Sequence, residues 1–179
     1  PSYALDMMNR VRKALSLGLE KPDSRFRALR SLALLDLFQG QYRAAAAKLR
    51  EAILVESKPE LALNRAREHL FLSLVREGQG NRSADWRELD EAHKSLSAAQ
   101  PAVWLLLRIG AVYARAGALD KATTLLKQAR PLVDLKNNEH LSDLHLLEGE
   151  LEFARGNSAR ALEIFQLAER ENSWPPTLE

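Results

Sequence analysis

The chain has 179 residues, of which 34 are Leu and 26 are Ala, both strong helix formers. Val, Ile and Thr together number only 12, so a fold rich in β-sheet is nearly excluded. Lys and Arg exceed Asp and Glu only by 26 to 24, which gives weak support to nucleic-acid binding, and the absence of Cys excludes disulfides and thiolate metal sites. We therefore expect an all-α fold.

A leading helix is predicted over residues 3–19, followed by four antiparallel helix hairpins and a tail over residues 172–179. The hairpins cover about residues 24–57, 59–99, 101–134 and 138–171. In each hairpin a Gly follows the first apolar-periodic stretch, and Gly readily adopts the left-handed conformation that ends a helix. The residues that predict these turns are Gly40, Gly78 (with Gly80 as the alternative), Gly117 and Gly156.

Three segments repeat without gaps, at residues 40–52, 117–129 and 156–168. Each reads Gly, four residues, Ala, three residues, Leu or Phe, two residues, Ala. The last three positions share one helical face. Ala allows a neighbouring helix to approach closely, and the larger side chain fills the gap, so the repeat predicts tightly packed helices.

These residues resemble the tetratricopeptide repeat (TPR), whose signature has Gly and Tyr in the first helix and Ala, an aromatic residue and Ala in the second. The third hairpin matches best, through Ile109, Gly110, Tyr113, Gly117, Leu119, Ala122, Leu126 and Ala129. The spacing from Gly117 to Gly156 exceeds the family period of about 34 residues. The resemblance implies a right-handed superhelical array of antiparallel helix hairpins, a TPR-like α-solenoid, as a single array over residues 1–179. Another helical-hairpin array is the close alternative.

Catalytic and metal-binding patterns are weak. The four histidines are His69, His93, His140 and His145. The nearest pair, His140 and His145, is five residues apart, so the two side chains lie on different helical faces. Glu148 and Glu152 share a face with each other but not with Glu150, and a solvated helix surface explains all three. We expect no catalytic residue, no cofactor and no metal site.

A partner-binding groove is predicted on the first helices of the hairpins, which usually line the concave face of such an array. Their residues outside the core combine Arg, aromatic and aliphatic side chains, a mixture enriched at interface hot spots. This predicts basic walls and an apolar floor that bind an acidic-hydrophobic peptide or partner helix. The assigned residues are Arg27, Arg30, Phe38, Arg65, Leu72, Arg76, Trp104, Arg108, Arg115 and Phe153.

The alternative interpretation of these residues is structural. Trp104 then packs on the preceding hairpin, and the arginines pair with acidic side chains. The acidic residues considered for this role are Glu60, Glu68 and Glu77.

Charge is unevenly distributed: residues 1–50 hold 10 basic and 4 acidic side chains, and residues 131–179 hold 4 basic and 10 acidic ones. Solvated surfaces explain this gradient, but opposite ends also favour weak head-to-tail self-association that salt weakens. No apolar run reaches the about 18 to 20 residues that span a bilayer. The start at Pro1, without Met, leads us to expect a fragment of a longer protein, with a cytoplasmic location slightly favoured over a periplasmic one.

The resulting expectation is a noncatalytic protein-interaction scaffold within a larger regulatory or assembly protein. TPR-like arrays of this longer kind also resemble those attached to bacterial signalling proteins and transcriptional regulators. The alternative is a sensor array that binds a small ligand or signalling peptide and controls an attached effector domain. We expect protein or peptide partners, and neither nucleic-acid binding nor a membrane segment.

Overall fold

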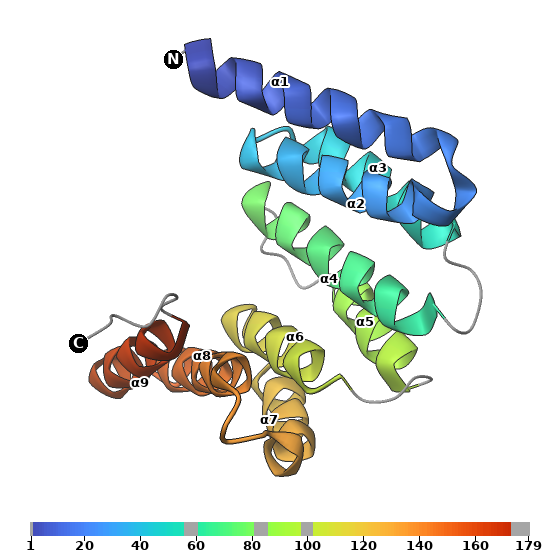
Figure 1. Ribbon diagram of the computed structural model, residues 1–179. Coiled ribbons are helices and arrows are strands. Elements are labelled where there is room, and N and C mark those ends of the chain that lie inside the picture. Colours follow the sequence, from blue (N-terminus) through green and yellow to red (C-terminus); the bar gives the residue numbers. More distant parts are fainter. Residues whose placement is uncertain (1, 56–60, 81–85, 98–101, 173–179) are drawn as a thin grey trace. The chain divides into compact units, whose positions relative to one another are not determined.

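A computed structural model of the chain describes residues 2–55, 61–80, 86–97 and 102–172 (Figure 1). Over these ranges the fold is all-α and contains no strand, which confirms the expected fold class at this level. None of the helices within these ranges is long and apolar enough to cross a membrane. The chain divides into two compact units, residues 1–99 and 100–179.

The first unit contains α1 (Ser2–Leu17), η1 (Gly18–Glu20), α2 (Pro22–Phe38), α3 (Tyr42–Val55), α4 (Ala62–Gly78) and α5 (Arg87–Ser97). Helix α3 packs against both α2 and α4, α4 also packs against α5, and α1 lies against α2 (Figure 1). Small and large apolar side chains alternate in the core between α2, α3 and α4, as the repeat predicted. This core cluster contains Ala33, Ala45, Ala46, Leu49, Leu72 and Val75.

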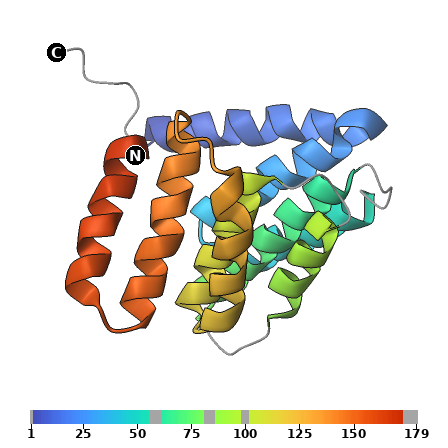
Figure 2. The same ribbon diagram turned by 90° about the horizontal axis from the view of Figure 1, so that it is seen from below.

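The second unit contains α6 (Val103–Arg115), α7 (Leu119–Ala129), η3 (Arg130–Leu132), α8 (Asn138–Ala154) and α9 (Ser158–Asn172). Here α6 packs against both α7 and α8, and α8 also packs against α7 and α9. Figure 2 shows α8 and α9 as an antiparallel pair joined by a short turn. Helix α8 begins after Asn137, whose Oδ1 accepts hydrogen bonds from the backbone N–H groups of Glu139 and His140.

Close packing in this unit depends on two glycines within helices. A Cβ atom at Gly110 of α6 would lie 2.8 Å from Leu147 of α8, and one at Gly149 of α8 would lie 2.5 Å from the Phe165 ring of α9. Because real Cβ atoms do not approach other atoms so closely, these glycines set the spacing between the helices. Leu147 is fully buried at the first of these contacts.

The helix pairs occupy the ranges predicted for the four hairpins, but one turn differs. Positive φ angles are found at Gly40, Gly80, Gly117 and Gly156, from 71° to 87°. The prediction of a turn at Gly78 was therefore wrong, and the alternative, Gly80, adopts the left-handed conformation. Gly78 is the last residue of α4, where a Cβ atom would lie 2.5 Å from the Tyr42 ring.

Smaller differences concern the ends of elements. The leading helix ends at Leu17 and continues as η1, and α2 begins at Pro22, two residues before the predicted start. Pro fits the first turn of a helix because the N–H it lacks has no partner there in any case. Of the predicted tail over residues 172–179, Asn172 is the last residue of α9, and residues 173–179 lie outside the described residues. The superhelical arrangement of the hairpins stays a prediction.

Candidate partner-binding surface

The ten residues assigned to the groove are divided between the two units. The first unit holds Arg27, Arg30, Phe38, Arg65, Leu72 and Arg76, and the second holds Trp104, Arg108, Arg115 and Phe153. The second set lies on α6 and α8, the two first helices of that unit, which contact each other directly.

Two ion pairs join α6 to α8. Arg108 Nε donates to both carboxylate oxygens of Asp143, at 2.9 and 3.2 Å, and Arg115 contacts Glu150 Oε1 through Nε and Nη2, at 3.0 and 2.9 Å. The two arginines are seven residues apart, as are the two acids, so the pairs lie about 10 Å apart along the helices. They form two parallel polar links across the helix pair.

Arg108 also stacks on an aromatic ring. Its guanidinium carbon lies 5.4 Å from the centre of the Trp104 ring, one turn earlier on α6. This distance is within the range of a cation–π contact. The Arg108 side chain remains 49% exposed and Trp104 is half-buried, so part of this pair faces solvent while Nε contacts Asp143.

Asp143 lies beneath this pair and is buried. Burial raises the pKa of the Asp143 carboxyl above its ordinary value, because the charged form loses contact with water, while the hydrogen bond and charge of Arg108 act in the opposite direction. Arg108 therefore has a structural partner as well as an exposed surface. Farther along α8, Phe153 follows Glu150 by one turn and is 59% exposed.

In the first unit, Arg30 and Glu68 link α2 to α4. Arg30 Nη1 lies 3.3 Å from Oε1 of Glu68, which is fully buried, and Arg67 Nε lies 3.8 Å from the same oxygen. Burial is the largest influence on Glu68 and raises its pKa to about 7, although both arginines lower it. The other carboxylate oxygen, Oε2, is buried and has no hydrogen-bond partner.

The remaining predicted residues of this unit have separate surroundings. Arg76 pairs with Glu88 of α5 at 3.0 Å, Arg27 stacks on Phe26 at 5.5 Å, and Arg65 is half-buried. Phe38 is 87% exposed at the end of α2.

The assignment of Leu72 to the partner-binding groove was wrong. It is only 2% exposed and packs in the core cluster of the first unit, so it has no surface to offer a partner.

The arginines thus follow the alternative interpretation in part, because Arg30 pairs with Glu68, as that interpretation expected. Arg108 and Arg115 pair with acidic residues of the same helix pair. Each positive charge on the α6–α8 surface has a negative neighbour, so this surface is mixed in charge rather than uniformly basic. We define the α6–α8 surface as Trp104, Arg108, Arg115, Glu150 and Phe153, with Asp143 beneath it.

A metal site is not evident in the part of the chain that the structure describes, since no three His, Asp or Glu side chains gather as a site would require. His69 and His145 instead contact single glutamates, Glu88 at 2.8 Å and Glu171 at 2.7 Å.

Comparison of the chain with known protein families and with curated protein sequences finds no match to either.

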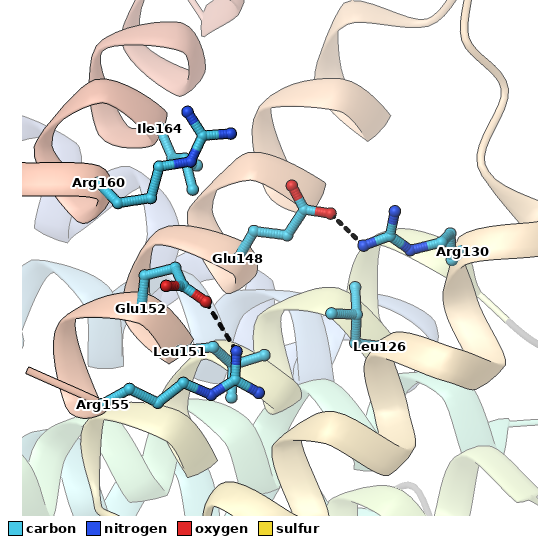
Figure 3. A pocket seen from close by; sticks show the side chains of 8 residues that line it. All are labelled: Leu126, Arg130, Glu148, Leu151, Glu152, Arg155, Arg160 and Ile164. Carbon is cyan, nitrogen blue, oxygen red and sulfur yellow. Dashed lines mark hydrogen bonds and ion pairs between the residues drawn. The ribbon is translucent and has the colours of Figure 1, made fainter. Parts of the chain in front are cut away.

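Sequence reasoning missed a pocket on the second unit, at the side where α7, η3, α8 and α9 meet (Figure 3). Its volume is about 430 Å³, and it is open to solvent. The lining residues are Leu126, Arg130, Glu148, Leu151, Glu152, Arg155, Arg160 and Ile164. Arg130 begins η3, Arg155 directly follows α8 and Arg160 lies in the first turn of α9, so no local pattern in the sequence indicates that they meet.

Proposed function

We propose that the chain is a noncatalytic, TPR-like interaction scaffold, and that its α6–α8 surface binds a peptide or helix of a partner protein. The observation that carries this proposal is the contact between half-buried Trp104 and exposed Arg108, whose Nε is held by buried Asp143. Trp and Arg are the residues most enriched at interface hot spots. A side chain held in place before binding loses less conformational entropy when a partner docks.

The chemistry of the surface suggests the partner. An apolar side chain of the partner fits against the Trp104 ring and, one turn beyond Glu150, against Phe153. An acidic group fits the guanidinium of Arg108, which has five N–H donors and contacts Asp143 through Nε. This retains an acidic-hydrophobic peptide as the proposed ligand, with fewer positive charges available than basic walls would give.

Selection from a random peptide library, followed by titration, tests the proposal. Selected peptides are expected to carry Asp or Glu beside aliphatic or aromatic residues. Their affinity should fall at least about tenfold in Trp104→Ala and Arg108→Ala, the scale of a hot-spot loss of more than 1.4 kcal/mol. Lys127→Gln, a change of one exposed charge on α7, serves as the matched control. Equal affinity in all variants would remove the surface assignment.

The second candidate function, a sensor array for a small ligand, is favoured by the pocket in Figure 3. Its volume of about 430 Å³ falls within the range of small-molecule sites. An open pocket excludes less water than an enclosed one, so we keep the interaction scaffold as the first proposal.

A further inference from the structure

The pocket between α7, η3, α8 and α9 has two separate kinds of wall. Leu126, Leu151 and Ile164 supply aliphatic surface, and Leu151 and Ile164 are buried. Three arginines and two glutamates also line the pocket, and no aromatic side chain is among the lining residues. A ligand that uses both walls therefore needs an aliphatic part and a charged part.

Four of the five charges are already paired within the pocket. Arg130 of η3 contacts Glu148, and Arg155 contacts Glu152 at 2.7 Å, as the dashed lines in Figure 3 mark. Glu152 also accepts a hydrogen bond from Asn157 at 2.7 Å, and these hydrogen bonds lower the pKa of its carboxyl. Each of the two glutamates thus has a cationic partner within the pocket.

Arg160 is the fifth charge and differs from the others. Its partner, Glu163 at 2.8 Å, lies three residues away on α9 and is not part of the lining. Both side chains of that pair are more than 60% exposed, and such exposed pairs contribute little free energy. The lining therefore carries one positive charge in excess, and it lies at Arg160.

Arg160 and Ile164 are one turn apart on α9, so they share one face of that helix. Figure 3 shows both on the same wall of the pocket, opposite Arg130, with Glu148 between the two walls. A guanidinium has a flat fork of donors that matches a carboxylate. An anionic head at Arg160 would place an attached chain along Ile164 and Leu151.

We propose that this pocket binds a small monoanion, a carboxylate on a short branched aliphatic chain, with the carboxylate at Arg160 and the chain on Ile164 and Leu151. This ligand site is independent of the α6–α8 surface proposed for protein partners. The positive excess of one charge favours a monoanion, and the aliphatic lining residues favour an apolar chain attached to it.

The probe is 4-methylpentanoate, titrated into the whole chain labelled with ¹⁵N and followed by amide chemical shifts. Saturable shifts are expected in α8 and α9. The matching amine, 4-methylpentylamine, tests the opposite possibility, a cation at Glu148 and Glu152. Acetate tests whether the aliphatic chain contributes, and it should bind at least about tenfold more weakly because its chain leaves the aliphatic wall unused.

Arg160→Gln is expected to weaken 4-methylpentanoate binding about tenfold, the scale of one charge-assisted hydrogen bond at an exposed site. This substitution leaves folding intact because the side chain is exposed, and the unchanged spectrum of the free variant verifies that. Lys127→Gln removes a positive charge from neighbouring α7 and should leave the affinity unchanged. Absence of saturation, equal binding of the amine, or full affinity in Arg160→Gln would each overturn the proposal.

Discussion

Arg108 of α6 contacts both carboxylate oxygens of Asp143 of α8, at 2.9 and 3.2 Å, although the two residues are 35 positions apart. The acid is buried and the arginine is half exposed, so the pair connects the interior of the second unit to its surface. Removing Arg108 should therefore affect stability as well as the proposed binding of a partner, and the two effects are separable.

Arg108→Ala should lower the free energy of unfolding by about 1 to 2 kcal/mol, because Asp143 loses its partner while water replaces part of the interaction. In a chain that already carries Asp143→Asn, Arg108→Ala should lower the free energy of unfolding by a smaller amount, since no buried charge remains to be neutralised. Urea unfolding of the four proteins measures the coupling. Additive effects would show that the two side chains do not stabilise each other.

Because the Glu68 carboxyl is buried, we expect the free energy of unfolding to depend on pH. Its pKa in the folded chain is about 7 against 4.5 without burial, so the folded state holds the proton more tightly. The contribution of Glu68 to the free energy of unfolding is therefore complete below about pH 4.5 and is lost as pH rises to about 7. The total loss is on the order of 3 kcal/mol.

Glu68→Gln removes this titration. The stability of the variant relative to the original chain should therefore rise between pH 5 and pH 8, as measured by urea unfolding at each pH. Glu20→Gln, an exposed control, should show no such trend. A relative stability of Glu68→Gln that falls with pH would mean that Arg30 stabilises the ionised carboxylate, contrary to this account.

Gly110→Ala tests the spacing of α6 and α8. Ala normally favours a helix over Gly by about 1 kcal/mol, but here its Cβ would lie 2.8 Å from the buried Leu147. We expect a net loss of about 1 to 2 kcal/mol from overpacking. Leu147→Ala should reduce the effect of Gly110→Ala, because it removes the clashing atoms; an undiminished effect would place the strain elsewhere.

Arg12 holds α1 on the first unit. It contacts Asp36 Oδ1 and Gln39 Oε1, both at 2.7 Å, and Asp36 is fully buried with Lys48 as its other partner, at 2.6 Å. Arg12→Ala should increase amide hydrogen exchange in α1, and much less in α3, because α1 opens locally before the core does. Equal increases in both helices would show that α1 and the core unfold together.

Self-association between the basic and acidic parts of the chain remains a prediction. Sedimentation at low and high salt measures it, and association that weakens with salt is expected because ions screen the charges. A monomer at every salt concentration would reject it.

Much of the helical architecture was predictable because it depends on local signals. Gly at φ near +70° to +90° and Ala at helical spacing act within a few residues, and Ala45, Ala52, Ala122 and Ala129 are all fully buried as expected. The rotation of each helix was less predictable. In α7 the side chain that fills the core is Leu125, whereas the expected Leu126 is half-buried and lines the pocket.

The error at Leu72 has a similar origin. Leu72 was assigned to a surface stripe of the predicted helix, but α4 packs against both α3 and α5, so its buried residues lie on more than one face. The contacts of Arg108 with Asp143 and of Arg130 with Glu148 join different helices, and composition and periodicity carry no information about such pairs.

The most direct test of the proposed function is the site at which a library-selected acidic-hydrophobic peptide binds. Amide and indole N–H chemical shifts of the ¹⁵N-labelled chain map that site during a titration. We predict saturable shifts of the Trp104 indole N–H and of backbone amides in α6 and α8, lost in Trp104→Ala. Shifts confined to other helices, with the Trp104 indole unmoved, would contradict the account.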